Sequence, residues 1–314
     1  MKCRVNKLRM IIIVSSMSAV FACSLFASSD TDKDILSNYE KVSVTLQVED
    51  PSMSTILTRD AELIMRPGAQ ATIIFFHGFK GSKDDVRPMR ALFFNYNTLI
   101  LDFRAHGANA SGQCCSFGAA EKYDVKAAFD FVKHHPQLKN LPIFGYGFSM
   151  GAASLIEAQA AFGPLFDALI LDSPFDDIEN VIKRGLRFLS LKLWGKDFLR
   201  PIRTFFERNI FTQSMNVVLR MMVKHAGMDV KKTATCLRPV SPINSIKKVT
   251  VPCLIISCQS DKHIPVDVIK NIFKGTPKGS ELWIASGRHH LDAFFSHPED
   301  YTQKVNMFLK KWLK

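Results

Sequence analysis

Residues 141–158 read LPIFGYGFSMGAASLIEA, and this stretch decides the fold. An apolar run of strand character leads into the pattern Gly-x-Ser-x-Gly centred on Ser149, and a helix-compatible run rich in Ala follows. In this context the serine lies on a sharp turn between a strand and a helix, where the flanking positions need little or no side chain. We therefore predict that Ser149 is a nucleophile; the alternative is a Gly-Ser turn that only links two elements.

A serine hydroxyl needs a base beside it, and that base needs a carboxylate to orient it. In the architecture that this turn indicates, the acid and then the histidine follow the serine along the chain. Asp261 comes just past the buried-strand pattern of residues 251–258, and His289-His290 follows the short strand pattern of residues 281–285. Both candidates thus follow the carboxyl ends of predicted strands, where open α/β sheets place their ligands.

The choice of histidine and acid leaves alternatives open. The side chains of His289 and His290 cannot both point at one serine, and we favour His289 as the base, with His290 as the alternative. Asp172 also ends a strand pattern, so it rivals Asp261 as the acid. Asp261 itself has a simpler interpretation as the cap of the next helix. His263 is interpreted as an ordinary loop histidine.

A further signal lies upstream, where the strand-like run of residues 71–76 ends at His77-Gly78-Phe79. Acyl transfer builds negative charge on a carbonyl oxygen, and backbone N–H groups aimed at that oxygen lower the barrier. One donor is the residue after the nucleophile, which is Met150, and the other comes from the loop after an earlier strand. Phe79 is the best candidate for this second donor; the alternative is an ordinary turn at the end of a strand.

Apolar runs along the chain predict an α/β fold. Continuous apolar runs indicate strands covered on both faces, and helical patterns such as residues 123–132 lie between them. The alternation favours a mostly parallel sheet of about eight strands with helices on both faces. Residues 41–48 alternate like a half-buried antiparallel strand. The continuous runs are 71–76, 98–102, 142–146, 168–172, 252–257 and 281–285.

The alternation breaks at about residues 176–248, where we expect an inserted helical lid. This segment holds fifteen Lys or Arg and six Asp or Glu, so it carries nine of the twelve net positive charges of the chain. Apolar residues at helical spacing over residues 178–193 indicate a basic amphipathic helix. Such a helix either contacts an anionic membrane surface or substrate, or packs on its own domain with a solvated basic face. We expect no nucleic-acid binding, because no recognition fold accompanies the charge.

The first 27 residues have the pattern of a secretory signal peptide or an N-terminal membrane anchor. Four Lys or Arg precede an almost uncharged run of about seventeen residues, and small residues follow. The sequence from Val20 to Cys23 is also similar to a bacterial lipoprotein box. We therefore expect an exported protein, periplasmic, secreted or membrane-anchored, with its main domain at residues 42–314.

The seven cysteines do not form a pattern typical of a disulfide framework. Two lie in the predicted leader, and the remaining five are an odd number. Cys253 and Cys258 belong to a predicted core strand and are expected to be buried thiols. The adjacent Cys114-Cys115 receives no role, and no spacing indicates a zinc site.

Taken together, these motifs resemble those of the α/β-hydrolase superfamily, in its bacterial esterase, serine-aminopeptidase-like and dienelactone-hydrolase-like branch. The resemblance rests on His77-Gly78, residues 102–107, the serine turn, Asp261 and the Gly-x-His segment at residues 287–289. It covers roughly residues 42–314 and implies an α/β-hydrolase fold. The adjacent histidines and the basic segment depart from the usual pattern.

The motifs and the resemblance together imply hydrolysis of a carboxylic ester or related acyl bond in a small-molecule or lipid substrate. Ser149 would attack the carbonyl, His289 would take its proton and Asp261 would orient the imidazole, while Phe79 and Met150 stabilise the oxyanion. No metal or organic cofactor is needed. The alternatives are a lipase, a thioesterase, a serine aminopeptidase, or a non-catalytic protein of this fold that binds a membrane or acidic partner through its basic lid.

Overall fold

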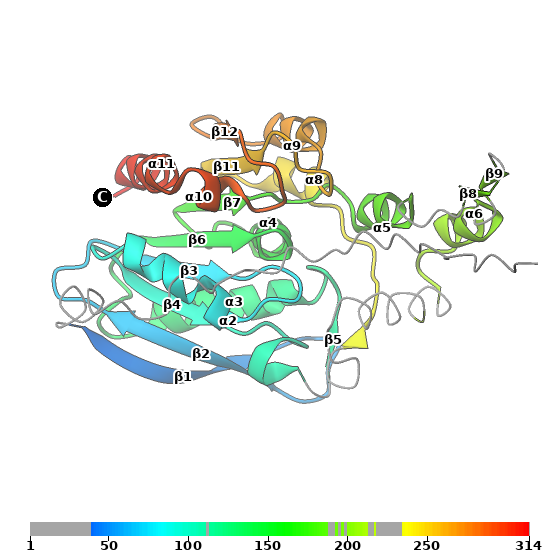
Figure 1. Ribbon diagram of the computed structural model, residues 1–314. Coiled ribbons are helices and arrows are strands. Elements are labelled where there is room, and N and C mark those ends of the chain that lie inside the picture. The colour runs from blue at the N-terminus through cyan, green and yellow to red at the C-terminus, as the bar shows by residue number, and fades with distance from the viewer. Residues whose placement is uncertain are drawn as a thin grey trace, which may run out of the picture.

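The computed structural model describes residues 39–110, 113–187, 192–193, 196–197, 200–212, 217 and 234–313. Within these residues a central sheet is flanked by helices on both faces (Figure 1). The predicted leader at residues 1–27 lies outside the described part of the chain. Among the helices that are described, none is long and apolar enough to cross a membrane.

Eight strands form the central sheet: β1 (Glu40–Val48), β2 (Leu57–Met65), β3 (Thr72–Phe76), β4 (Asn97–Leu101), β6 (Ile143–Phe148), β7 (Ala168–Asp172), β11 (Cys253–Cys258) and β12 (Glu281–Ala285). Their order across the sheet is β1-β2-β4-β3-β6-β7-β11-β12. β2 runs antiparallel to β1 and β4, and all other neighbours are parallel. The predicted mostly parallel sheet is confirmed.

Side chains of the inner strands alternate between two hydrophobic cores. In β3, Ile74 and Phe76 face one core, whereas Ile73 and Phe75 face the other. All residues of β3, β4, β6, β7 and β11 are buried, so both faces of these strands must be apolar. β1 lies at the edge of the sheet and alternates exposed with buried positions, as its sequence predicted.

Helices close both cores. Leu155 and Ile269 belong to helices on the first side, and Tyr301 and Phe308 to a helix on the second. The first side carries α3 (Glu121–His134), α4 (Met150–Phe162), α8 (Pro242–Ser245) and α9 (Val266–Phe273). The second side carries α2 (Lys83–Val86), α10 (Ala293–Ser296) and α11 (Pro298–Lys310). The described part of the chain also forms the short 3₁₀ helices η2 (Arg87–Leu92), η3 (Gly107–Asn109) and η4 (Ile246–Lys248).

The segment after β7 leaves the sheet, and α5 and α6 lie beyond its end (Figure 1). Ile178, Ile182 and Leu186 of α5 are buried in the first core, so the apolar face of this helix packs on its own domain. The predicted helix over residues 178–193 is too long, because α5 ends at residue 187 and residues 192–193 form a strand. The elements here are α5 (Ile178–Arg187), β8 (Lys192–Leu193), β9 (Lys196–Asp197), α6 (Arg200–Arg208) and β10 (Ala234–Thr235).

A disulfide joins Cys114 to Cys236, although the sequence pattern indicated no disulfide framework and gave Cys114 no role. Cys114 begins the short strand β5 (Cys114–Cys115), which pairs in parallel with β10. The two cysteines are 122 residues apart, so nothing in the local sequence around either one points to the other. Cys253 and Cys258 are free and buried, as predicted.

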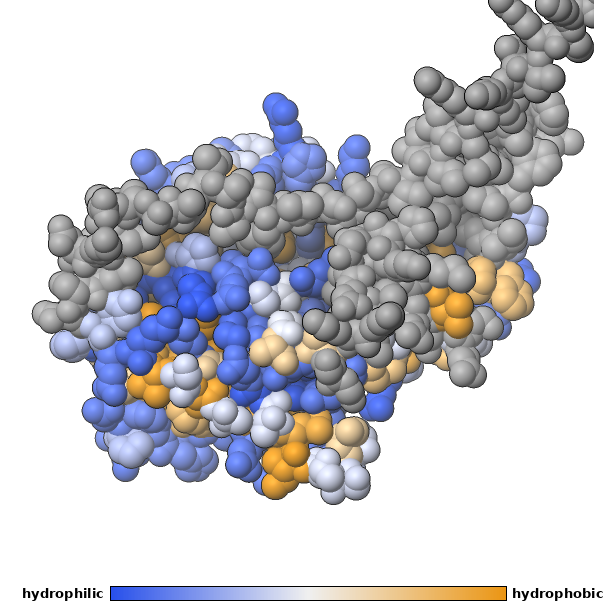
Figure 2. Space-filling view, turned by 60° about the horizontal axis from the view of Figure 1, so that its bottom comes forward, coloured by the Kyte–Doolittle hydropathy of each residue, from blue (hydrophilic) through white to orange (hydrophobic). Residues whose placement is uncertain are grey.

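Hydrophilic and apolar residues alternate on the described surface (Figure 2). On the face of the molecule shown in Figure 2, apolar residues form separate small patches between hydrophilic ones, so the described residues present no continuous apolar surface there. The large apolar side chains that are most exposed are scattered along the chain: Met53, Ile56, Phe94, Phe205, Phe211, Val217, Phe295 and Met307.

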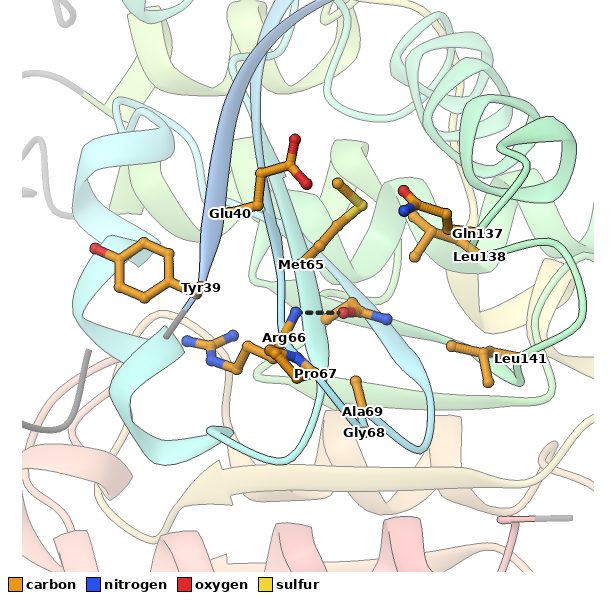
Figure 3. A pocket seen from close by; sticks show the side chains of 11 residues that line it. Tyr39, Glu40, Met65, Arg66, Pro67, Gly68, Ala69, Gln137, Leu138 and Leu141 are labelled. Carbon is orange, nitrogen blue, oxygen red and sulfur yellow. Dashed lines mark hydrogen bonds between the residues drawn. The ribbon is translucent and has the colours of Figure 1, made fainter. Parts of the chain in front are cut away.

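One surface groove of about 830 Å³ lies at the amino ends of the parallel strands (Figure 3). Its lining comes from the start of β1, the end of β2 with the turn that follows it, the first residue of β4 and the loop before β6. Arg66 donates from its backbone N–H to Asn97 Oδ1 at 2.8 Å, and its guanidinium lies 5.9 Å from the centre of the Tyr39 ring. The groove is thus at the opposite end of the sheet from Ser149.

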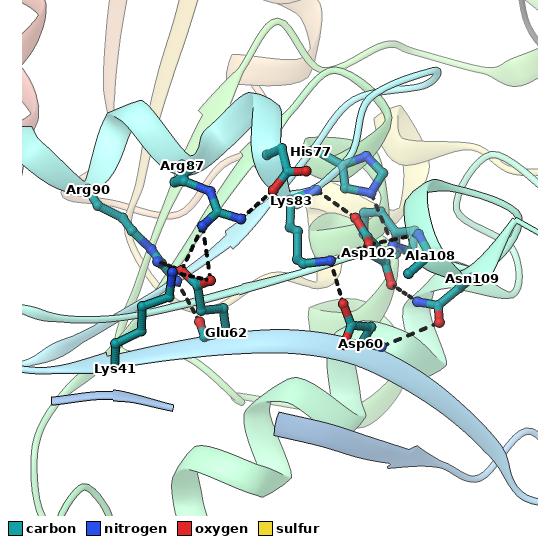
Figure 4. A network of polar contacts seen from close by, with 12 residues as sticks. Lys41, Asp60, Glu62, His77, Lys83, Arg87, Arg90, Asp102, Ala108 and Asn109 are labelled. Carbon is teal, nitrogen blue, oxygen red and sulfur yellow. Dashed lines mark hydrogen bonds and ion pairs between the residues drawn. The ribbon is translucent and has the colours of Figure 1, made fainter. Parts of the chain in front are cut away.

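A network of charged side chains ties the antiparallel edge of the sheet to α2 and β4 (Figure 4). Lys83, the first residue of α2, pairs with Asp60 and lies 2.8 Å from Asp102 Oδ2. Asp102 also accepts the backbone N–H of Lys83 at 2.7 Å. Burial raises the pKa of Asp102, but the hydrogen bonds from Lys83 outweigh burial and hold that pKa below its usual range. These contacts therefore anchor the loop between β3 and α2 at the end where α2 begins.

Candidate active site

Ser149 lies on a strained turn between β6 and α4. Its backbone has φ 50° and ψ −107°, a conformation that residues with a side chain adopt rarely. A Cβ atom at Gly147 would lie 2.5 Å from Ala152 N, and one at Gly151 would lie 2.1 Å from Phe76 O. Only glycine fits at these two positions, because the chain on either side of the serine packs directly against backbone.

The turn brings Ser149 into a chain of hydrogen bonds with two residues that are distant in sequence. His290 Nε2 lies 2.8 Å from Ser149 Oγ, and His290 Nδ1 lies 2.7 Å from Asp261 Oδ2. Asp261 follows β11, and His290 lies in the loop between β12 and α10. These three loops meet because β6, β7, β11 and β12 are neighbouring strands whose carboxyl ends share one edge of the sheet.

The structure places His290, and not the favoured His289, beside Ser149. The His289 side chain is exposed, whereas His290 is partly buried between Ser149 and Asp261. The backbone turns sharply here: Asp292 N donates to His289 O, and Leu291 has φ 63°. The two neighbouring histidines therefore point in different directions, and it is the alternative, His290, whose ring faces Ser149.

Asp261 is held as a carboxylate. Its Oδ1 accepts the backbone N–H groups of His263 at 2.8 Å and Ile264 at 2.9 Å, while its Oδ2 faces His290. Burial raises the pKa of Asp261, but the hydrogen bonds from His290 and the two backbone groups outweigh it and lower that pKa. An ionised carboxylate can only accept, so His290 Nδ1 carries a proton, and in the neutral imidazole Nε2 is then the nitrogen that accepts from the Ser149 hydroxyl.

Asp172, the alternative candidate for the catalytic acid, instead holds the backbone of the turn at Ser149. Its backbone oxygen accepts Ser149 N–H at 2.8 Å. Its buried carboxyl accepts from Tyr301 at 2.7 Å and from Ser173 at 2.9 Å. Burial raises the pKa of Asp172 to about 6, against these hydrogen bonds, which lower it. The structure thus puts Asp261, and not Asp172, in contact with His290.

The loop after β3 runs beside the serine. A Cβ atom at Gly78 would lie 3.6 Å from Ser149 Cβ. His77 Nε2 accepts Phe103 N–H at 3.0 Å, so Nδ1 carries the ring proton and donates to Gly78 O at 2.8 Å. Burial, followed by the neighbouring His106, lowers the pKa of His77 to about 3, so this ring is neutral near pH 7.

The bond from His77 sets the direction of the peptide between Gly78 and Phe79. In a trans peptide the C=O and N–H groups point in opposite directions. Because the Gly78 oxygen turns toward His77, the Phe79 N–H turns away from it. Met150 is the first residue of α4, where backbone N–H groups have no partner within the helix. Both predicted oxyanion donors therefore belong to backbone that lies next to Ser149.

Two residues near the serine had simpler interpretations in the sequence. His263, expected to be an ordinary loop histidine, has its ring centre 5.9 Å from that of His290. Burial and the neighbouring His290 lower the pKa of His263. His77 was interpreted only as part of a strand-ending motif, although its ring holds the loop beside Ser149. Its position directly after a buried strand and before a glycine was the available signal.

Two surface hollows are lined by residues that the structure describes, and neither contains Ser149, His290 or Asp261. The first is the groove at the amino ends of the strands. The second, of about 470 Å³, lies on α6. Among the described residues, no group of three or more His, Cys, Asp or Glu is arranged to hold a metal ion. The functional groups that meet at the site are the Ser149 hydroxyl, the His290 imidazole and the Asp261 carboxylate.

Comparisons with known proteins agree with this architecture. Protein bem46 of Schizosaccharomyces pombe is 27% identical over 158 residues, which are 48% of this chain and 50% of that protein. The uncharacterized peptidase YtmA of Bacillus subtilis is 23% identical over 252 residues, 79% of this chain and 84% of YtmA. The esterase Pf2001 of Pyrococcus furiosus has the same fold, with a TM-score of 0.66, 22% identity, and coverage of 92% of this chain and 97% of the esterase.

A sequence model of the alpha/beta hydrolase family matches residues 73–304, which is well over half of the chain. The match begins in β3, before the His77 loop, and ends in α11, after the His290 loop. It therefore contains every residue of the candidate site. This chain belongs to the alpha/beta hydrolase family.

Proposed function

We propose that this protein is a serine hydrolase that cleaves a carboxylic ester or a related acyl bond through an acyl-enzyme intermediate. Membership of the alpha/beta hydrolase family supports a hydrolase. The observation that carries the finer proposal is the continuous chain from Ser149 Oγ to His290 Nε2 at 2.8 Å, and from His290 Nδ1 to Asp261 Oδ2 at 2.7 Å. This is the geometry that a serine needs to lose its proton as it attacks.

In the proposed reaction, Ser149 Oγ attacks the acyl carbonyl and passes its proton to His290 Nε2. Asp261 keeps the imidazole in the required tautomer and stabilises the imidazolium that forms. The N–H groups of Phe79 and Met150 donate to the oxyanion of the tetrahedral intermediate. His290 then protonates the leaving group. A water molecule, deprotonated by His290, attacks the acyl-enzyme and releases the acid and free Ser149.

The predicted leader and the predicted lid suggest where in the cell the protein is found and whether it contacts a membrane. We propose export, in line with the predicted leader, and a structural disulfide fits an oxidising compartment. Lys183 and Arg184 of α5 are paired with acidic side chains, and the apolar face of α5 is buried. A membrane contact would therefore use α6, where exposed Phe205 lies beside Arg208 in the same hollow.

Membrane contact is tested by co-sedimentation with vesicles. The wild-type protein should bind anionic vesicles more strongly than zwitterionic ones, and Phe205→Ser should weaken this binding. Phe94→Ser is a matched control, because Phe94 is also an exposed phenylalanine but lies in the main domain after η2. Equal binding to both kinds of vesicle, or no effect of Phe205→Ser, would contradict contact through α6.

The proposed chemistry is tested by labelling with a fluorophosphonate, which reacts with activated serines. Wild-type protein should be labelled and Ser149→Ala should not, while both unfold at similar urea concentrations. Labelling that persists in Ser149→Ala, or its absence in a folded wild-type protein, would contradict the mechanism. The second of these outcomes would favour a non-catalytic protein of this fold.

The substrate class is separated by a panel of compounds. A series of p-nitrophenyl esters of increasing chain length tests an esterase, and the same series with detergent or vesicles tests a lipase. Acyl thioesters test a thioesterase, and aminoacyl arylamides test an aminopeptidase, which the name of YtmA makes worth including. We expect the highest kcat/KM for an ester; a higher value for an arylamide would replace the esterase by a peptidase.

A further inference from the structure

A short segment of the main domain touches both residues that we propose as oxyanion donors. This segment, residues 114–117, is called the strap here. The Phe117 ring lies 4.7 Å from the Phe79 ring, centre to centre. Cys115 Sγ lies 3.5 Å from Met150 Sδ. Cys115 and Phe117 are both buried, so the strap packs closely against the side chains of Phe79 and Met150, the two residues that we propose as oxyanion donors.

The strap is held in a conformation that it would not adopt on its own. Phe117 has φ 59°, which is a genuine outlier for a bulky residue and persists only where the surrounding structure enforces it. The enforcing group is Glu121, whose buried carboxylate accepts Ser116 N–H at 2.8 Å and Gly118 N–H at 2.7 Å. The Ser116 hydroxyl also donates to this carboxylate at 2.7 Å. The turn that Glu121 holds after Cys115 therefore keeps the Phe117 ring in contact with the Phe79 ring.

The other end of the strap is held covalently. The disulfide joins Cys114 to Cys236, and Cys236 N donates to Cys115 O at 2.9 Å. The bond thus fixes the start of the strap to the residue that directly follows β10. Without it, β5 would be a strand of two residues paired only with another strand of two residues, which is too short to be stable alone.

We propose that the Cys114–Cys236 disulfide positions the oxyanion hole, because it holds the strap against Phe79 and Met150. The proposal rests on the proposed function. Donors in an oxyanion hole act only within about 2.7–3.1 Å of the developing charge. A displacement of about 1 Å can cost roughly a hundredfold in rate. A support that touches both donor residues therefore affects the transition state more than it affects binding of the substrate.

The experiment compares the full-length double variant Cys114→Ser/Cys236→Ser with the wild type and with Cys253→Ser. Cys253 is a matched control, because it is also a cysteine but forms no disulfide. It is the first residue of β11 and so lies at the amino end of that strand, at the opposite end of the sheet from Ser149. Two quantities are measured: kcat and KM for the best ester, and the inhibition constant of a trifluoromethyl ketone, which binds as a tetrahedral oxyanion. Circular dichroism monitors folding.

We expect the double variant to lose about ten- to a hundredfold in kcat, with KM changed by less than about threefold. Affinity for the ketone should fall by the same factor, whereas Cys253→Ser should match the wild type in both. A folded double variant with unchanged kcat and ketone affinity would overturn the proposal. So would a loss confined to thermal stability, since that is what a purely structural disulfide would give.

Phe117→Ala tests the same support with the disulfide intact, and it decides the outcome if the double variant fails to fold. It should lower kcat and ketone affinity in parallel, because it removes the ring that packs on Phe79. Unchanged values for both would overturn the proposal. Absence of ester turnover and of fluorophosphonate labelling in the wild type is a different result, which would contradict the proposed function itself.

Discussion

Two substitutions of His77 can separate the two hydrogen bonds that its ring makes. Nδ1 donates to Gly78 O at 2.8 Å, and Nε2 accepts Phe103 N–H at 3.0 Å. An asparagine amide nitrogen can take the place of Nδ1, and a glutamine amide oxygen can take the place of Nε2, because the two side chains differ by one methylene. His77→Asn therefore keeps the bond to Gly78, and His77→Gln keeps the bond to Phe103.

The two variants should fail in different ways. His77→Gln should lower kcat, because it frees the peptide that carries the Phe79 N–H to rotate away from the oxyanion. Complete loss of one such donor costs about 10²- to 10³-fold in kcat, so we expect a loss of at least about tenfold and at most this much. His77→Asn should keep most of kcat but lose about 1–3 kcal/mol of unfolding free energy, because the buried Phe103 N–H loses its acceptor.

The assay is ester hydrolysis at saturating substrate, together with urea unfolding of both variants. Because burial and the neighbouring His106 lower the pKa of His77 to about 3, the ring stays neutral above about pH 5, and the ratio of wild-type to variant kcat should not change between pH 6 and about pH 9. A larger loss of kcat in His77→Asn than in His77→Gln would refute the reasoning. An unchanged kcat in a folded His77→Gln variant would do the same.

Three further predictions follow from the site. His290→Ala should lower kcat by at least about 10⁴-fold while His289→Ala stays within about twofold, and equal small losses from both would contradict the placement of the base. Asp261→Asn should cost roughly 10⁴-fold in kcat, because an amide cannot hold the imidazole in the same tautomer; near-normal ester turnover would exclude its role. Burial raises the pKa of Asp172 to about 6 from 3.8. Between these two pH values the folded protein therefore binds more protons than the unfolded chain. The stability that protonated Asp172 contributes is lost as pH rises from about 4 to about 6. The difference in unfolding free energy between wild type and Asp172→Asn should therefore shift by about 2–3 kcal/mol between pH 4 and pH 8, in favour of the wild type at pH 4, and a constant difference in urea unfolding would contradict this sign.

The fold was largely predictable from the sequence, because its signals are local. Each inner strand is buried on both faces and is therefore a continuous apolar run, such as the one before Ser149. The sharp turn at Ser149 needs glycine at fixed positions on either side. Asp261 was found because ligand-binding residues of such sheets follow the carboxyl ends of strands.

The structure differs from the expectations, or adds to them, at features that depend on distant or three-dimensional information. Which of His289 and His290 faces the serine is decided by the direction of one tight turn, and residue order carries no record of that direction. The bond between Cys114 and Cys236 depends on a return of the chain across 122 residues. The end of the helix that begins at Ile178 was misjudged because apolar residues keep a helical spacing beyond residue 187.

The disulfide also determines what happens to this chain when a protease cuts it. Ser149 lies inside the loop that Cys114 and Cys236 close, whereas Asp261 and His290 lie outside it. A single cut anywhere between residues 150 and 235 would therefore separate the serine from its two partners along the chain, yet leave both fragments joined as one molecule. The fragments cannot diffuse apart, so each faces the other at an effective concentration of about millimolar, and a nicked molecule can reassemble its catalytic group as long as that bond stays oxidised.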